Sequence, residues 1–273
     1  MRDGEDRGKK KAIMSKQLDD NAELFRIMPL ERFLQMLVEG RNTLVSPLLW
    51  DDPFEVLFDE DFIEEINKRH EIETDAPIYR LNYNNWFAQC WSMVSESDAL
   101  WRVFSKNTTQ RCVKIKTTVA ELNKITHKQD NDTKFYLQAV KYGNIEDGSY
   151  MEGDEEWEDI LPYDDENEDL LNLEARILLM KRNAFESEKE VRLLVHVNNL
   201  DKDLNVYSYE VNPLELITEV QLDPWTPKET FKAIEIAINA CAPHGINKIK
   251  VKPSVLYDGK ISKRILLDKI YST

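Results

Sequence analysis

The sequence predicts a single α+β domain. Strand-like and helix-like segments alternate irregularly along its 273 residues, with no internal repeat and no linker between them. The chain also lacks the GxGxxG and GxxxxGKS/T motifs, so neither a Rossmann dinucleotide-binding unit nor a P-loop is supported. We therefore expect a split or mixed β-sheet with flanking helices over residues 23–273, preceded by a polar, flexible leader at residues 1–22.

Proline and glycine positions define the elements of the first half. An apolar strand at 24–28 carries one charged residue, Arg26. Pro29 begins an amphipathic helix that Gly40 ends, because proline fits the first turn of a helix and glycine the position after the last. A second strand follows at 43–46. The further expected elements are a turn at Trp50–Glu55, a helix at 59–69, a strand at 85–91, a helix at 97–105, a strand at 111–116, a helix at 117–126 and a strand at 134–142.

The second half begins with an acidic insertion. Residues 143–175 contain fourteen Asp or Glu residues and no Lys or Arg, a composition typical of a solvated, mobile segment. Apolar residues at helical spacing then predict a helix at 168–183, and an apolar run predicts a strand at 190–197. The remaining expected elements are strands at 206–211 and 219–222, a helix at 226–241, and strands at 248–252 and 261–267.

The net charge of −15 belongs mainly to this insertion, because the rest of the chain carries a net charge of only −1. A nearly neutral body argues against non-specific binding to nucleic acid, although a nucleic acid is not excluded as a substrate. The insertion has two interpretations. It is a solvated loop, or else it binds a regulator such as an antitoxin or imitates a nucleic acid.

Composition also indicates where the protein works. No apolar run approaches the roughly 18–20 residues that span a bilayer, and no signal peptide follows the basic N-terminus, so we expect a cytoplasmic protein with no membrane contact. The three cysteines have no CxxC spacing and the four histidines no HExxH spacing. We therefore expect reduced thiols and no metal site.

The triplet Glu188-Lys189-Glu190 opens the predicted strand at 190–197. On a strand, side chains two apart share a face, so both carboxylates would lie together at the mouth of a buried strand. About nine acid-x-acid triplets are expected by chance in a chain with 51 acidic residues, so the triplet alone has little weight. The structural alternative is a strand-end acid paired with Arg192 or Lys189.

A series of blocks gives the triplet more weight. In order along the chain these are Leu24-Phe-Arg-Ile-Met28, Leu44-Val-Ser-Pro47, Trp50-Asp-Asp-Pro-Phe-Glu55, Ala88-Gln-Cys-Trp-Ser92, Ser97-Asp-Ala-Leu-Trp-Arg102 and Glu188-Lys-Glu-Val-Arg192. The series resembles, over roughly residues 23–197, a bacterial family described as a domain of unknown function (twenty-nine seventy-one). The chain departs from the family pattern at Val45, Asp51 and Val191.

The family in turn resembles, more distantly, the ADP-ribosyltransferase fold of the Arg–Ser–Glu type. In that fold an Arg lies on the first strand, a Ser on the second and a Glu-x-Glu on a later one, and Arg26, Ser46 and Glu190 occur here in the same order. The resemblance implies an ADP-ribosyltransferase-like fold and NAD as the substrate. The usual Ser-Thr-Ser is reduced to Val45-Ser46-Pro47, and a hydroxyl that starts the turn at Pro47 is the alternative for Ser46.

The resemblance also implies a role for each residue. Glu190 would bind a ribose hydroxyl and stabilise the oxocarbenium-like centre left by nicotinamide, since that centre needs nearby negative charge. Glu188 would orient or deprotonate the acceptor. Arg26 would bind a pyrophosphate oxygen, for which a guanidinium is well shaped, and Ser46 would hold the ribose or brace Glu190.

Two further blocks are candidates for nucleotide contacts. In the Trp50–Glu55 turn, Asp52 and Phe54 are binding candidates if the turn closes over the nucleotide, whereas Trp50 is expected to pack. Trp91 and Ser92 are the other candidates. Core packing is the alternative for Trp91, with base stacking as the functional interpretation.

We therefore predict an enzyme that uses NAD to ADP-ribosylate an intracellular protein or nucleic acid, resembling bacterial toxins or phage-defence effectors. One alternative is an NAD glycohydrolase, with water as the acceptor. Another is a non-catalytic binding module on the same fold. A third is a metal-dependent nuclease, which requires Asp51, Asp52 and the Glu pair to converge in space.

Overall fold

The computed structural model describes residues 18–56, 83–106, 109–126, 132–143, 170–198, 200, 204–242, 249–259, 263–264 and 267. The expected helix at 59–69, most of the leader and most of the acidic insertion lie outside these residues. Among the described residues, no helix is both long enough and apolar enough to cross a membrane.

The described chain has an α+β fold built on a mixed, nine-stranded sheet. The strand order is β11-β10-β4-β1-β3-β2-β9, and β8 pairs with β3 and carries β5 on its other edge. Only β10 and β11 are parallel within this sheet. The strands are β1 (Glu23–Pro29), β2 (Arg41–Val45), β3 (Trp86–Ser92), β4 (Cys112–Thr118), β5 (Thr133–Ala139), β8 (Glu190–Val197), β9 (Val206–Glu210), β10 (Glu219–Leu222) and β11 (Val251–Lys252).

Helices and a small second sheet complete the fold. The α-helices are α1 (Leu30–Glu39), α3 (Asp98–Phe104), α4 (Val119–Thr126), α6 (Leu170–Ile177), α7 (Pro213–Leu216) and α8 (Lys228–Cys241). The 3₁₀ helices are η1 (Pro47–Leu49), η2 (Pro53–Val56), η3 (Tyr83–Asn85) and η4 (Asn183–Glu188). Strands β6 (Lys141–Gly143) and β7 (Met180–Arg182) form a parallel pair beside the main sheet.

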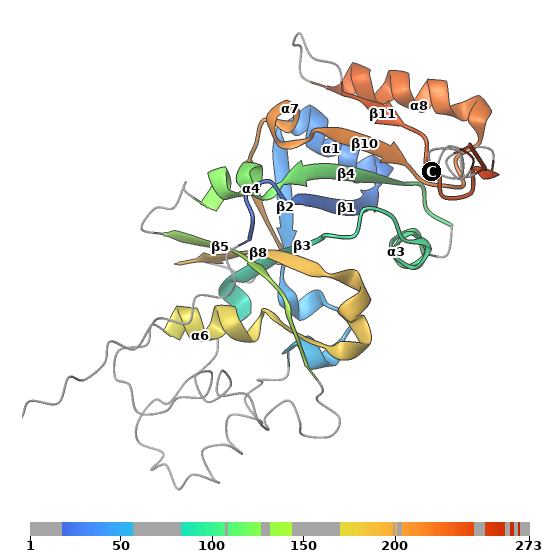
Figure 1. Ribbon diagram of the computed structural model, residues 1–273. Helices are drawn as coiled ribbons and strands as arrows, with labels where there is room; N and C mark the ends of the chain where they lie inside the picture. The colour runs from blue at the N-terminus through green and yellow to red at the C-terminus, as the bar shows by residue number, and fades with distance from the viewer. Residues whose placement is uncertain are drawn as a thin grey trace, which may run out of the picture.

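The main sheet divides between β1 and β3. These neighbours are paired at one position only, Phe25 with Ser92, whereas β1 pairs with β4 and β3 with β8 along their whole lengths. Figure 1 shows the result, with β1, β4 and β10 in the upper half of the molecule and β3, β8 and β5 below them. Because the two strands diverge, space opens between the halves.

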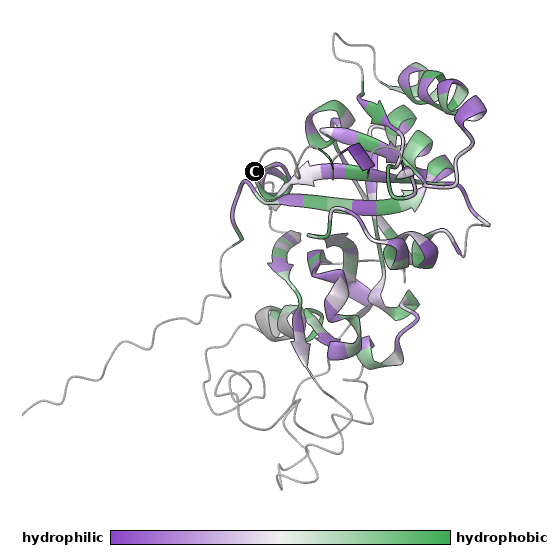
Figure 2. Cartoon of the chain, turned by 45° about the vertical axis from the view of Figure 1, so that its right-hand side comes forward, coloured by the Kyte–Doolittle hydropathy of each residue, from purple (hydrophilic) through white to green (hydrophobic). Residues whose placement is uncertain are grey.

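The core lies on both faces of the sheet. The larger cluster packs α1, α4 and α8 against residues such as Phe87 and Leu193, and a smaller one packs α6 against Trp86 and Leu194. All eight residues of β8 are therefore buried. Figure 2 shows hydrophobic and hydrophilic residues alternating along the helices, as expected for helices that cover a sheet on one side only.

The local signals placed most elements correctly. Helix α1 follows Pro29, and Gly40 ends it in the left-handed conformation at φ 62°. Three expectations are wrong. The helix expected at 168–183 ends at Ile177, the strand expected at 134–142 is broken at Val140 into β5 and β6, and the described residues of 261–267 are helical rather than extended.

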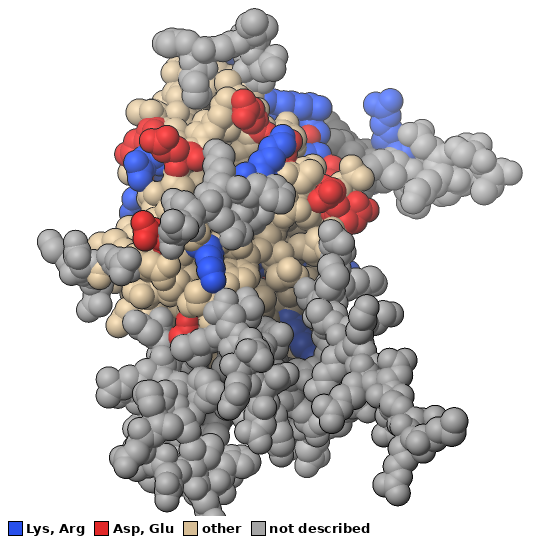
Figure 3. All heavy atoms as spheres, turned by 90° about the vertical axis from the view of Figure 1, so that its left-hand side faces the viewer, with Lys and Arg blue, Asp and Glu red and all other residues tan. Residues whose placement is uncertain are grey.

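Surface charges of both signs lie close together on the described part of the chain. On the face drawn in Figure 3, Lys and Arg side chains alternate with Asp and Glu side chains, and no patch of one sign forms among the coloured residues. On this face the described residues therefore form no broad basic footprint for nucleic acid.

Candidate functional site

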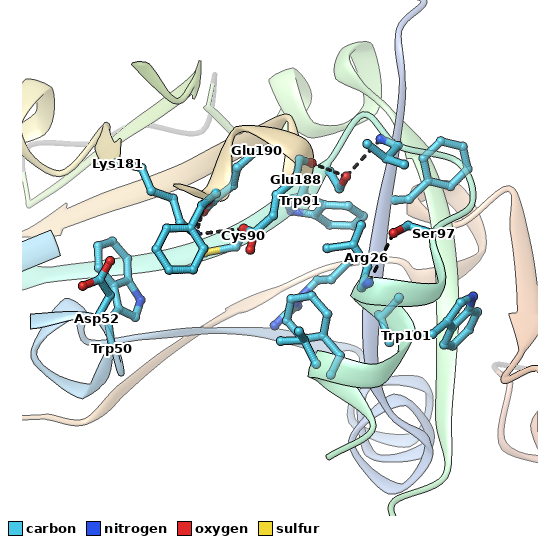
Figure 4. Close-up of a pocket in the computed structure, with 18 of the residues that line it drawn as sticks. Arg26, Trp50, Asp52, Cys90, Trp91, Ser97, Trp101, Lys181, Glu188 and Glu190 are labelled. Carbon is cyan, nitrogen blue, oxygen red and sulfur yellow. Dashed lines mark hydrogen bonds and ion pairs between the residues drawn. The ribbon is translucent and has the colours of Figure 1, made fainter. Parts of the chain in front are cut away.

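A pocket of about 430 Å³ lies where β1 and β3 diverge. Its walls come from β1, β3 and β4, from the segment that leads into η2, from α3 and the turn before it, and from β7, η4 and the start of β8. Figure 4 shows these side chains converging from both halves of the sheet. The pocket brings together six of the residues proposed from the sequence, namely Arg26, Asp52, Trp91, Ser92, Glu188 and Glu190.

Two proposed residues do not line it. Ser46 lies just beyond β2, is 3% exposed, and accepts a hydrogen bond from the backbone N–H of Leu48 at 3.4 Å, so it caps η1. This is the turn-starting role given above as the alternative. Phe54 is 37% exposed and packs behind the pocket wall, with the guanidinium of Arg182 4.4 Å from its ring centre.

Arg26 reaches the pocket because of the divergence. Strand alternation places Phe25 and its partner Ser92 on one face of the sheet and Arg26 on the other. Arg26 nevertheless lines the same pocket as Glu190, because β1 turns away from β3 on either side of the Phe25–Ser92 pair. Figure 4 shows Arg26 between Cys90 and Trp101.

The guanidinium of Arg26 has little to compensate its charge. Its one hydrogen bond is a long one, from NH1 to Oδ1 of Asn42 at 3.5 Å. Within the described ranges no carboxylate forms an ion pair with it, and burial lowers its pKa. A cation that is removed from water without a counter-ion is a ready binding point for an anion.

A network of buried amides lies behind Arg26. Gln89 donates to Oδ1 of Asn42 at 2.9 Å and accepts from the indole N–H of Trp91 at 2.9 Å. Asn42 donates in turn to the hydroxyl of Tyr209 at 2.8 Å. Because these groups bond to one another, the orientations of Arg26 and of Trp91 at the pocket are coupled to the same pair of amides.

The opposite wall carries a cluster of charges around Glu190. Arg192 donates from Nε to Oε1 of Glu190 at 2.7 Å and from NH2 to Oε2 at 3.2 Å. Lys181 contacts Oε2 of Glu190 at 2.9 Å. Burial alone would raise the pKa of Glu190, but Arg192 and Lys181 lower it to about 2. Glu190 is therefore ionised at neutral pH, with both oxygens engaged.

Two more glutamates share these cations. Lys181 lies 2.8 Å from Oε2 of Glu188 and 3.2 Å from Oε1 of Glu55, and Arg192 lies 2.9 Å from Oε2 of Glu55. Burial raises the pKa of Glu55 against the effect of both cations. The side chain of Glu188 is 23% exposed, whereas those of Glu55 and Glu190 are 7% and 3% exposed. Glu188 is thus the most accessible carboxylate of the three.

The segment from Trp50 to Val56 is fixed to this cluster. The guanidinium of Arg192 lies 4.2 Å from the centre of the Trp50 ring, and Asp52 accepts two hydrogen bonds from Arg182 at 3.0 and 3.1 Å. Trp50, which was expected to pack, lies against Arg192 and lines the pocket, and Asp52 lines it as well. The segment therefore forms a wall held by ion pairs.

The triplet itself is not a continuous strand. Glu188 ends η4, Lys189 is left-handed at φ 43° and ψ 56°, and only Glu190 belongs to β8. Both carboxylates still reach the pocket, so the expected outcome is correct but the reason is different. The tight turn at Lys189 also places the carbonyl of Glu188 where the hydroxyl of Ser92 donates to it, at 2.5 Å.

We predict that Lys189→Gly raises the free energy of unfolding by about 1 kcal/mol, because glycine adopts the left-handed conformation without the steric cost that other residues carry. Lys189→Ala is the matched control. It removes the same charge but keeps the Cβ atom, so it should give no gain. Urea denaturation of both variants measures the difference, and equal stabilities would contradict the argument.

Sequence analysis did not nominate Lys181, Arg182 or Glu55 as site residues. Lys181 and Arg182 lie inside the stretch expected to be a helix, at 168–183. One signal was available. Acids at the start of a buried strand need cations close by, and Lys181-Arg182 and Arg192 are the nearest cations on the N-terminal and C-terminal sides apart from Lys189.

The metal-dependent nuclease needs acidic groups that converge on an ion. Over the described ranges, no group of three or more His, Cys, Asp or Glu side chains is arranged to hold a metal. The carboxylates of Glu55, Glu188 and Glu190 do converge, but on the ammonium group of Lys181. Asp52 is engaged with Arg182.

Comparison with known proteins supports part of this picture. The model of a protein family of unknown function, DUF2971, matches residues 100–193, about a third of the chain, and confirms the family resemblance over that stretch. The match includes Lys181, Glu188 and Glu190 but not Arg26 or Asp52. No curated protein matches the chain.

Among solved structures, the DarT protein of Thermus sp. 2.9, in complex with ADP-ribosylated single-stranded DNA, is similar to this chain. The alignment covers 88% of this chain and 98% of DarT, at 11% sequence identity and a TM-score of 0.37. Values this low do not allow residues to be transferred between the two proteins.

Proposed function

We propose that the pocket binds NAD and that the protein transfers ADP-ribose from it to an intracellular macromolecule. The observation that carries the proposal is the charge distribution in the pocket. One side presents Arg26, a half-buried guanidinium without a carboxylate partner in the described chain. The other side presents three glutamates with two cations, a cluster with a net charge of −1. NAD has a matching polarity, with an anionic pyrophosphate and a cationic nicotinamide ribose.

The aromatic walls fit the flat parts of such a ligand. Trp91 and Trp101 line the pocket but are only 1% and 0% exposed, whereas Phe185 is half-buried on the glutamate side, with the ammonium group of Lys181 4.8 Å from its ring centre. Aromatic rings of this kind stack on heterocycles, with a contribution of roughly 1–3 kcal/mol per base. Trp91 packs in the hydrophobic core, the alternative given above, so of these three rings Phe185 is the one exposed enough to stack on a base or on nicotinamide.

The chemistry assigns different tasks to the two glutamates of the triplet. When the bond between nicotinamide and ribose breaks, its electrons leave with nicotinamide and an oxocarbenium-like sugar remains. Glu190, ionised and held by Arg192, supplies a fixed negative field at that centre. Glu188 is more exposed and accepts the proton of the attacking nucleophile. That nucleophile is a protein or nucleic-acid group, in the manner of a toxin or phage-defence effector.

One observation favours a second candidate function. Both oxygens of Glu190 are engaged in ion pairs, and these three hydrogen bonds occupy three of the roughly four lone-pair directions of the carboxylate, which leaves one, on Oε1, for a ribose hydroxyl. A domain that binds NAD or a related nucleotide without turning it over would also have this arrangement. The same protein would then act as a nucleotide-dependent interaction module.

We predict that Glu188→Gln lowers the rate of ADP-ribose transfer at least 100-fold while NAD binding is kept, because a proton acceptor in the transition state contributes roughly 10²–10⁴. Glu186→Gln is the matched control, since Glu186 lies on the same 3₁₀ helix, two residues before Glu188, and is exposed. The measurement uses NAD labelled in the adenylate part, a cell lysate as the source of acceptor, and calorimetry for binding.

The outcomes separate the candidates. Label on a macromolecule supports transfer, and release of nicotinamide without label supports an NAD glycohydrolase. Binding without either product supports the interaction module. Absence of NAD binding would overturn the proposal, and equal activities for the Glu188→Gln and Glu186→Gln variants would remove Glu188 from the mechanism.

A further inference from the structure

Lys181 lies at the centre of the carboxylate cluster. Its ammonium group is 2.8 Å from Glu188, 2.9 Å from Glu190 and 3.2 Å from Glu55, and its side chain is 11% exposed. Three carboxylates from η2, η4 and β8 thus meet on one cation.

The backbone fixes this position. Lys181 lies on β7, opposite Tyr142 on β6 in a parallel pair, so both side chains leave the small sheet on the same face. The hydroxyl of Tyr142 accepts a hydrogen bond from the backbone N–H of Glu190 at 2.8 Å. The two-stranded sheet therefore delivers one group to the main chain of Glu190 and one to its carboxylate.

Without this cation the cluster would be unfavourable. Two carboxylates that share a site tend to share one proton as well, because like charges a few ångströms apart in a dry environment do not both ionise. Arg192 reaches Glu190 and Glu55 but has no bond to Glu188. In the described cluster, Lys181 is the group that joins Glu188 to Glu190.

We propose that Lys181 is a positioning residue that holds Glu188 and Glu190 side by side at the pocket wall, both as charged carboxylates. Where it concerns turnover, this rests on the proposed function. The charged and titratable groups that face Lys181 or its partners are Glu55 from η2, Cys90 from β3, Tyr142 from β6, Arg182 from β7, Glu188 from η4, and Glu190 and Arg192 from β8.

The neighbours of Lys181 determine the direction in which its loss shifts the titration of the two glutamates. Burial opposes the charged form of Lys181, but Glu190 and Glu55 raise its pKa overall. The pKa of Glu190 is lowered to about 2 and that of Lys181 is raised, so Lys181 and Glu190 are both charged from acidic to alkaline pH. Loss of Lys181 should therefore move proton uptake by the glutamate pair to higher pH, and with it the acidic limb of any rate that needs both charges.

The test is a pH titration of ¹³C-labelled glutamate carboxyls by NMR in the full chain, with signals assigned from the Glu188→Gln variant. In Lys181→Met we expect one of the two carboxyls to take up a proton at least one pH unit higher than in the wild type, whereas Lys181→Arg should resemble the wild type. Lys189→Met removes an exposed charge between the same two glutamates and should leave the titration unchanged. An unchanged titration in Lys181→Met would overturn the proposal.

A measurement on the wild type covers the case in which Lys181→Met does not fold. The ¹³Cε signal of Lys181 should stay in its charged position at a pH where exposed lysines have titrated. A midpoint equal to that of exposed lysines would overturn the proposal. If the protein does not act on NAD, the proposed function fails, but these two titrations still decide the role of Lys181. If the protein does act on NAD, the midpoint of the acidic limb of its pH–rate profile should move up by at least one pH unit in Lys181→Met. In Lys181→Arg the midpoint should return to its wild-type value.

Discussion

Replacing Arg192 with methionine should lower the free energy of unfolding by roughly 3–5 kcal/mol, because it leaves buried carboxylates without their partner. Arg192 is 0% exposed and donates hydrogen bonds to Glu190, to Glu55 and to the carbonyl of Leu178. Thermal and urea denaturation measure the effect, which corresponds to a fall in Tm on the order of 10 °C for a domain of this size.

A surface ion pair is the matched control. Lys124 lies 2.7 Å from Glu121 with its side chain 65% exposed, so Lys124→Met should change stability by less than about 1 kcal/mol. A second variant separates charge from packing. Glu190→Gln added to Arg192→Met removes one of the stranded carboxylates, so the double variant should be more stable than the sum of the single effects predicts. Strictly additive effects would show that Arg192 acts through packing alone.

Elements with local signals could be predicted from the sequence. Helix α1 has proline before it and glycine after it, and β1, β3 and β8 are apolar runs of ordinary strand length. Strand β7 could not be predicted in this way. Its three residues follow α6 in an apolar stretch that continues the helical period, and they become a strand only by pairing with β6. Pairing between distant segments is a tertiary effect that local propensity does not report.

The same limit applied to the site. Arg26 and Glu190 were nominated from their order along the chain, and the divergence of β1 from β3 that unites them depends on the whole sheet. Lys181 was overlooked because its segment was assigned to the wrong element. Ser46 was nominated by resemblance, whereas its own neighbour Pro47 already indicated a capping role, which is the role that its hydrogen bond to Leu48 shows.

Arg26 offers the clearest separation between binding and stability. Its guanidinium is half-buried beside Asn42, an amide, rather than beside a carboxylate. Folding therefore carries the cost of an uncompensated charge, which a bound phosphate would offset. Arg26→Met keeps most of the aliphatic side chain and removes that charge. We expect the variant to be as stable as the wild type or more stable, while its affinity for ADP falls roughly 10- to 100-fold, the value of one hydrogen-bonded charge.

Asn42→Asp tests the same role of Arg26 by adding a negative charge beside it instead of removing its positive charge. The substitution keeps the shape of the side chain but places a carboxylate beside Arg26, so an internal ion pair competes with the phosphate. Affinity for ADP should fall in this variant as well, and the salt dependence of binding should weaken in both. Arg32→Met, on the exposed face of α1, is the control and should change neither property. Calorimetric titration with ADP and urea denaturation supply the measurements. A large loss of stability in Arg26→Met with unchanged affinity would show that Arg26 holds the sheet together rather than a ligand. We expect the opposite result, because a cation that only stabilises the fold has no reason to lack a carboxylate partner.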